Sequence, residues 1–242
     1  MTTVTIGRSR RTGGLLSAAA REHLGWLAGG LALGFLVPFV FADRMGVPRD
    51  AYYAIYAVAV LAFLTAWTRS TGTDPVAMIR RHWIAAVTLG LVCAGILAAI
   101  VVGTEEAGTR PGGAELAGAV LWRGVVYGAV DGLLLSAFPI LAVFAAFAAG
   151  RGHRSRRDHV AIGALALVAS LAMTSAYHAG YAQFRSQDMR APLAGDVVWS
   201  APTLLTLNPV GAPIAHIGLH TSAVLHSPDT DLFLPPSEAG SR

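Results

Sequence analysis

Apolar residues dominate six long stretches of the chain, and polar or charged residues separate them. The stretches are 17 to 28 residues long, close to the roughly 20 residues that an α-helix needs to cross a bilayer. They are Leu24–Phe41, Ala51–Trp67, Trp83–Gly103, Trp122–Ala149, Val160–Tyr177 and Thr203–Leu225. The pattern therefore predicts an all-α fold, a polytopic transmembrane bundle of about six helices.

The predicted bundle, residues 24–226, lies between two polar tails. Residues 1–23 form a basic tail, and residues 227–242 form a short tail that we expect to be loosely ordered. The first apolar stretch is long for the core of a signal peptide and other spans follow it, so we expect an uncleaved first helix.

The basic residues predict the orientation of the bundle. All 18 are arginine. The segments 1–23, 68–82 and 150–159 carry eleven arginines together, whereas the connections 42–50, 104–115 and 183–202 carry five. Arginine concentrates in the cytoplasmic segments of membrane proteins, so we expect the N-terminus and the tail 227–242 in the cytoplasm.

Composition agrees with a membrane protein. Hydrophobic residues make up 54% of the chain and charged residues 13%, against about 25% charged in soluble domains. The lipid bilayer is the expected partner, and the +4 charge, explained by the arginine distribution, predicts no nucleic-acid binding. Abundant Ala, Gly and Val without lysine are typical of a GC-rich bacterial genome, so the predicted location is the bacterial inner membrane.

Asp131 is the only carboxylate inside any of the six predicted spans. A charged side chain at membrane depth costs about 2.5–3.5 kcal/mol on insertion scales, so such a residue is by default a functional hypothesis. Alternatively, Asp131 is hydrogen-bonded and only holds helices together. Gly124, Gly128 and Gly132 form a smooth neighbouring face, which predicts close helix packing within the chain or between chains of an oligomer.

Histidines in the later spans supply potential metal ligands. His216 and His220 are four residues apart and share one helix face, the helical half of many zinc sites. Asn208 and Pro209 predict the start of this helix on the outer side, which places His216 at a depth of about 11–12 Å, similar to that of Asp131. With His178 at the end of the fifth span, these residues predict a zinc site in the outer leaflet, with Asp131 and His178 also as acid/base groups.

The order of these residues resembles that in the CPBP family, bacterial membrane proteins related to prenylated-protein-processing (CAAX) endopeptidases. Leu121-Trp122-Arg123-Gly124 is similar to the end of the family's first motif, and His178 and His216 match the histidines of later motifs. Gly118 and Ala119 stand where the family has its glutamates, and His220 replaces an asparagine. The resemblance implies a membrane hydrolase, with Asp131 in the role of the missing acid.

We therefore expect a metal-dependent membrane hydrolase acting on a lipid or a membrane-embedded peptide. Three alternatives use the same residues. The polar side chains would line a proton or solute path in a transporter, His178 and His216 would bind haem in an electron carrier, or all four would be structural in a non-catalytic membrane subunit.

Overall fold

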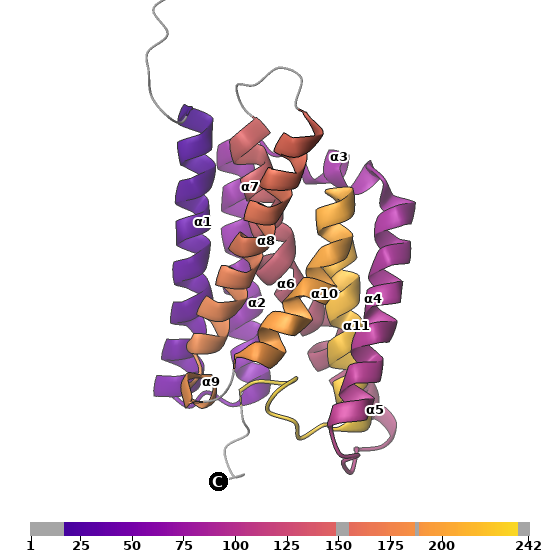
Figure 1. The fold of residues 1–242 in the computed structure, drawn as a ribbon. Coiled ribbons are helices and arrows are strands. Elements are labelled where there is room, and N and C mark those ends of the chain that lie inside the picture. The colour runs from indigo at the N-terminus through magenta and orange to yellow at the C-terminus, as the bar shows by residue number, and fades with distance from the viewer. Residues whose placement is uncertain (1–16, 149–154, 187–188, 237–242) are drawn as a thin grey trace, which may run out of the picture.

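The computed structural model describes residues 17–148, 155–186 and 189–236, which fold into a bundle of antiparallel helices without strands (Figure 1). This confirms the predicted all-α bundle. Segments labelled η are π-helical. The elements in chain order are α1 (Ala18–Val37), η1 (Pro38–Arg44), α2 (Arg49–Thr71), α3 (Pro75–Arg80), α4 (Trp83–Thr104), α5 (Gly113–Ala119), η2 (Val120–Tyr127), α6 (Gly128–Gly132), η3 (Leu133–Ala137), α7 (Phe138–Ala148), α8 (Arg156–Ala179), α9 (Ala182–Ser186), α10 (Arg190–Thr206) and α11 (Gly211–His226).

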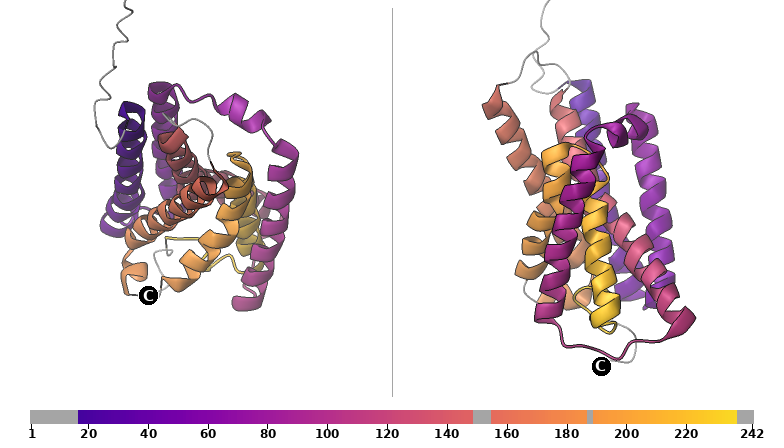
Figure 2. Two further views of the ribbon diagram at one scale, coloured as in Figure 1. Left: turned by 45° about the horizontal axis from the view of Figure 1, so that its top comes forward. Right: turned by 90° about the vertical axis from the view of Figure 1, so that its right-hand side faces the viewer.

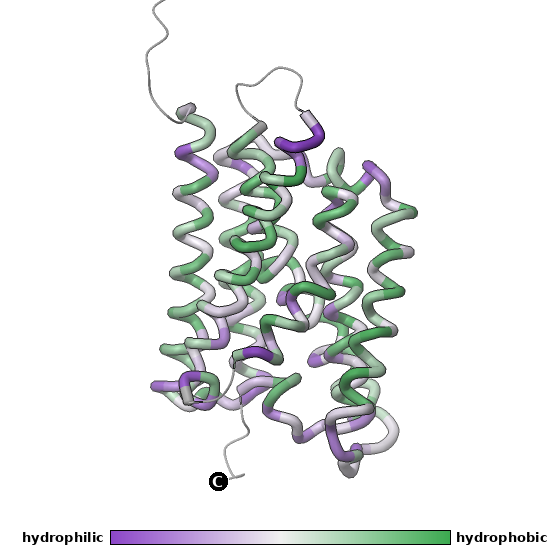
Figure 3. The backbone as a smooth tube through the Cα atoms, viewed as in Figure 1, coloured by the Kyte–Doolittle hydropathy of each residue, from purple (hydrophilic) through white to green (hydrophobic). Residues whose placement is uncertain are grey.

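The outer surface of the bundle is apolar along much of its length (Figure 3). Large hydrophobic side chains such as Val58, Leu91 and Val168 are 70%, 60% and 59% exposed. Such a surface suits lipid rather than water. Within the part of the chain that the structure describes, five helical runs are long and apolar enough to cross a membrane: Ala18–Arg44, Arg49–Thr71, Trp83–Thr104, Gly113–Phe147 and Arg156–Ala179.

The segment before the last predicted span is helical, contrary to the sequence analysis. Residues 183–202 were expected to form a connection, but α10 covers Arg190–Thr206. The chain turns at Leu207, which has a left-handed backbone (φ 52°), and α11 then begins at Gly211. The predicted span Thr203–Leu225 therefore contains the end of one helix and most of another.

The turn between α10 and α11 reverses the predicted direction of the last helix. The Asn208 side-chain amide donates to the carbonyl oxygens of Met78 and Ile79 at 3.2 and 2.8 Å, next to α3 at the end of the bundle where α1 begins (Figure 2). Helix α11 thus starts at that end and runs away from it. The turn carries no arginine, so the predicted asymmetry of eleven arginines against five is unchanged.

Residues 227–236 pack against the bundle instead of forming a loose tail, and they lie at the end opposite to the start of α1 (Figure 1). Arg49, which is 3% exposed, holds this segment. Its guanidinium donates to the carbonyl oxygens of Pro236 at 3.0 Å and Pro228 at 3.3 Å, and lies 3.5 Å from the Asp231 carboxylate. An N-terminus in the cytoplasm would place this segment on the outer side, not in the cytoplasm.

The glycine face is used inside the chain. A Cβ on Gly128 would lie 3.0 Å from the carbonyl oxygen of His216, and one on Gly132 would lie 2.7 Å from the Cα of Pro213. Both neighbours belong to α11, and Gly124 also faces that helix. Helix α11 covers this face, so the expectation that a second chain packs there is not supported.

A proline shapes the helix that carries Asp131. Pro139 has no N–H to donate to the Leu135 carbonyl one turn earlier, and the Ser170 hydroxyl of α8 donates to that oxygen at 2.8 Å instead. The π-helical segments η2 and η3 flank Asp131 on both sides. Such local departures from α-helical geometry occur often at functional sites.

Candidate functional site: an Asp/His cavity

The four residues predicted from the sequence meet at one cavity of about 330 Å³. Asp131 comes from α6, His178 from the last turn of α8, and His216 and His220 from α11. The rest of the lining is largely apolar and comes from α4, α10 and residues 232–235. Few convergent polar groups in an apolar cavity are typical of small-molecule sites.

Asp131 is 4% exposed and its two oxygens have different neighbours. The Tyr56 hydroxyl donates to Oδ1 at 2.8 Å. Oδ2 lies 3.5 Å from Nε2 of His220 and 3.9 Å from Nε2 of His216. Tyr56 therefore fixes one oxygen, while the other faces both histidines of α11.

Backbone carbonyls set the tautomers of two histidines. Nδ1 of His220 lies 2.7 Å from the Phe233 carbonyl oxygen, and Nδ1 of His178 lies 2.8 Å from that of Thr174. A carbonyl oxygen only accepts, so each Nδ1 carries the hydrogen and each neutral ring presents an unprotonated Nε2. Neither ring nitrogen of His216 has a hydrogen-bond partner.

Aromatic rings hold the α11 histidines in place. The Trp199 ring lies 4.4 Å from that of His216, and the Tyr127 ring lies 4.8 Å from that of His220, measured between centroids. Among the described residues, no group of three or more His, Cys, Asp or Glu side chains has the spacing of a formed metal site. The zinc ion expected from the sequence therefore stays a prediction.

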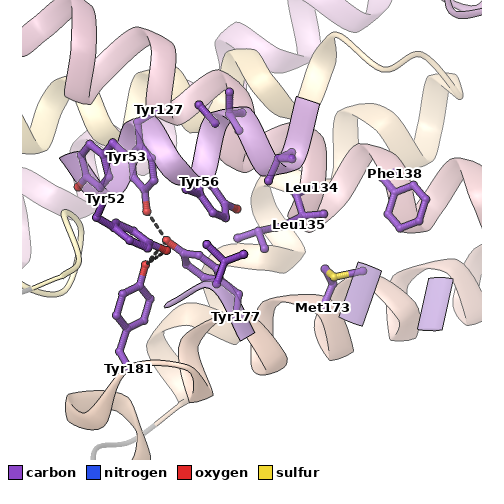
Figure 4. Close-up of a cluster of buried hydrophobic side chains, with 14 of the residues drawn as sticks. Tyr52, Tyr53, Tyr56, Tyr127, Leu134, Leu135, Phe138, Met173, Tyr177 and Tyr181 are labelled. Carbon is purple, nitrogen blue, oxygen red and sulfur yellow. Dashed lines mark hydrogen bonds between the residues drawn. The ribbon is translucent and has the colours of Figure 1, made fainter. Parts of the chain in front are cut away.

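All six tyrosines of the chain are buried, and the hydroxyl groups of four of them form a hydrogen-bonded chain (Figure 4). Tyr181 bonds to Tyr52 at 2.8 Å and to Tyr177 at 2.5 Å, and Tyr177 also bonds to Tyr127. This cluster satisfies polar groups deep in the bundle and surrounds the Asp131–Tyr56 pair with rigid side chains.

A second buried carboxylate, Asp196 of α10, was missed because its segment was expected to be a connection. It is fully buried, and the hydroxyls of Ser200 and Ser136 donate to its Oδ1 at 2.7 and 3.3 Å. The Ser170 hydroxyl lies 2.9 Å from the same oxygen and shares its one hydrogen between Asp196 and the Leu135 carbonyl. These serines come from three elements, so Asp196 joins α10 to α8 and η3. It does not line the cavity.

The spacing of tyrosines in the sequence indicated part of the tyrosine cluster around Asp131. Tyr52 and Tyr56 are four residues apart and share one face of α2. Tyr177 and Tyr181 have the same spacing, although α8 ends at Ala179 and Tyr181 lies in the turn that follows it. The carbonyl of Phe233 had no such signal, because it reaches His220 only through the folding of residues 227–236. Arg123, which carries part of the family resemblance, pairs with Asp50 at 2.8 Å and does not line the cavity.

Replacing Arg49 by methionine should release residues 227–236 and with them the Phe233 carbonyl that orients His220. Loss of such an orienting partner typically lowers metal affinity by about 10–100-fold. We expect faster proteolysis within residues 227–236 and weaker binding of the zinc ion that the sequence predicts. Arg44→Met is the control, because the Arg44 side chain is 69% exposed; equal protection of the segment in both variants would contradict the anchoring role of Arg49.

Comparisons with known proteins found no match: no family model, curated protein or solved structure is similar to this chain. The resemblance to the CPBP family therefore stays a prediction. The fold and the apolar surface fit one class, the integral membrane proteins built from helical bundles. Within that class, this chain is distinguished by a buried Asp/His cavity.

Proposed function

We propose that the chain is a metal-dependent hydrolase of the membrane. In this proposal Asp131, His216 and His220 hold a zinc ion, and His178 is the acid/base group beside it. The observation that carries the proposal is geometric: His220 directs Nδ1 at the Phe233 carbonyl and Nε2 at Asp131 Oδ2, 3.5 Å away, in a buried site.

Two acceptors in contact repel each other unless a cation lies between them. Since His220 Nδ1 already carries the ring hydrogen, a proton or a metal ion has to bridge Nε2 and the carboxylate. Metal-bound histidines almost always donate their other ring N–H to a carbonyl or carboxylate, as His220 does to Phe233. A doubly protonated ring with a single positive charge is the competing explanation, and the experiment below separates the two.

The spacing and type of the donors favour zinc. Zinc bonds of about 2.0–2.1 Å to nitrogen and oxygen put two tetrahedral donors about 3.4 Å apart. The 3.5 Å separation between Asp131 and His220 is close to this value, and His216, at 3.9 Å from Asp131, would have to move about 0.5 Å closer to join them. Three protein ligands with one open position are the usual set of a catalytic zinc site.

A bound zinc ion would supply Lewis-acid activation of a water molecule. His178 lines the same cavity and directs Nδ1 at the Thr174 carbonyl, so its Nε2 would be free to accept a proton from the attacking water as the water oxygen bonds to an acyl carbon. His178 would then return the proton to the leaving oxygen or nitrogen as the acyl bond breaks. Tyr56 keeps the Asp131 carboxylate oriented throughout.

Elemental analysis of the detergent-purified protein tests this proposal. We expect about one zinc per chain in the unaltered protein, as in catalytic zinc sites, and a near-complete loss in His220→Ala. The matched control is His159→Ala, an exposed histidine of α8, which should keep its zinc. Folding is compared by circular dichroism and thermal unfolding.

Absence of zinc from the unaltered protein, even after dialysis against zinc, would contradict the metal-dependent reading. It would favour a proton, instead of a metal ion, between His220 Nε2 and the Asp131 carboxylate. The site would then belong to a proton path or have a structural role. Equal zinc in both histidine variants would place the metal elsewhere on the chain.

A further inference from the structure

We infer that the cavity binds the hydrocarbon chain of a single-chain amphiphile, which reaches it sideways from the bilayer between α4 and α10. The claim that this amphiphile is also the substrate rests on the proposed hydrolase function. Its binding is independent of any metal or reaction and is tested separately.

The mouth of the cavity lies on the membrane-facing side of the bundle. Ile100 and Thr104 of α4 and Ala191 and Ala194 of α10 line it, and all four are exposed. Ala191 and Ala194 are small, so α10 presents little side-chain bulk toward α4 there. The two helices also diverge toward this end of the bundle (Figure 1). Lipid is therefore the medium that meets the opening.

The tail segment closes the cavity toward the end of the bundle. Leu232, Phe233 and Pro235 contribute to the lining, and Arg49 anchors their segment through the Pro228 and Pro236 carbonyls. This cover favours access from the side over access from the water at the bundle end. It also adds apolar surface to the cavity.

The lining suits a hydrocarbon chain better than a peptide. Between the mouth and the Asp/His group the cavity is lined by apolar side chains such as Leu97, Trp199 and Leu219, which are 1%, 5% and 4% exposed. The Thr104 hydroxyl at the mouth already donates to the Ile100 carbonyl at 2.8 Å. A peptide backbone would leave its N–H and C=O groups unpaired there, whereas a hydrocarbon chain has none to satisfy.

The volume and the position of the polar group favour one chain with its polar end inward. About 330 Å³ is at the low end of the roughly 300–1,000 Å³ of small-molecule sites, which argues against a complete two-chain lipid. Asp131 is the only Asp, Glu, Lys or Arg in the described lining, and the three imidazoles lie in the same lining. An ester, amide or acid group on the chain would lie against them.

Photo-crosslinking tests this inference in vesicles of phosphatidylcholine that hold the full-length protein. The probe is a long-chain fatty acid with a diazirine on its hydrocarbon chain, and the labelled positions are mapped by mass spectrometry. We expect labelling of Leu97 and Leu219, which are buried and face the cavity. Lipid that only surrounds the protein cannot reach them.

Two variants close the mouth from opposite sides. Ala194→Trp and Ile100→Trp should each lower labelling of Leu219 by at least about tenfold, which corresponds to about 1.4 kcal/mol. Ala164→Trp is the control, because Ala164 is an exposed alanine of α8 outside the cavity lining. Thermal unfolding shows that all three variants are folded.

Labelling confined to exposed residues such as Leu91 and Val168, or labelling of Leu219 that neither mouth variant lowers, would overturn the inference. A protein that contains zinc but takes no label would leave the proposed function standing and reject the hydrocarbon chain. A protein that takes the label but holds no zinc would leave the binding of a hydrocarbon chain standing and reject the proposed function.

Discussion

Replacing Gly132 by leucine should prevent α11 from docking on the helix that carries Asp131. A Cβ at Gly132 would lie 2.7 Å from Pro213 Cα, 2.8 Å from its nitrogen and 2.9 Å from the Ala212 carbonyl oxygen. These are backbone and ring atoms, which cannot rotate away, so α11 itself has to move. Overpacking typically costs about 1–3 kcal/mol, and a leucine adds more atoms to this contact than a methyl group would.

We expect the unfolding temperature of Gly132→Leu in detergent to fall by at least about 6 °C, since about 1 kcal/mol shifts it by about 2–4 °C in a chain of this length. Zinc binding should be lost with it, because His216 and His220 move with α11. The matched control is Gly118→Leu in α5, where a Cβ meets no atom within 4 Å. An unfolding temperature equal to that of the control would show that α11 does not pack as described.

The hydrophobic pattern was sufficient for the long, uniformly apolar helices and not for α10. Helix α10 contains Pro192, Asp196 and Pro202, which lower its apolar character, and it has only 17 residues. These residues are tolerated because of their contacts in the folded bundle. Asp196 bonds to three serines, and Pro202 packs on Gly211. That environment is a property of the assembled bundle, so local composition could not reveal it.

The four residues predicted from the sequence line one cavity, but the argument from depth was wrong. It started α11 on the outer side at Asn208, whereas α11 begins at the end of the bundle near α3. The residues still meet because His220 is near the middle of a 16-residue helix, so reversing the helix changes its depth little. The four-residue spacing of His216 and His220 was the stronger signal, since it does not depend on direction.

The residues that orient the site side chains lie far from them in the sequence, and no sequence pattern identified them in that role. Tyr56 reaches Asp131 from 75 residues away, and Phe233 reaches His220 from a tail that was expected to be loosely ordered. Both contacts depend on how whole segments pack. Helical spacing predicts which side chains share a face, but it does not predict which other segment that face meets.

Replacing Asp131 by asparagine should separate a metal ligand from a polar contact that only joins helices. Asparagine has nearly the same shape and can still accept the Tyr56 hydrogen bond, so a structural role predicts a protein with unchanged stability and unchanged zinc. A ligand role predicts a loss of zinc affinity of at least about 100-fold, because even an orienting partner of a ligand is worth about 10–100-fold. Zinc titration monitored by a competing chelator measures the difference.

Asp131→Leu completes this test. A structural role predicts lower stability of the metal-free protein, because the hydroxyl of Tyr56 loses its acceptor and the helices lose a polar contact. The ligand role predicts that the metal-free protein is at least as stable as before, since a buried charge without its cation has been removed. Asp50→Asn is the control for both variants, because its carboxylate is 53% exposed in a surface ion pair with Arg123, worth about 0–1 kcal/mol. Undiminished zinc affinity in Asp131→Asn would show that the histidines hold the metal without the carboxylate, and Asp131 would then be a structural residue of the bundle.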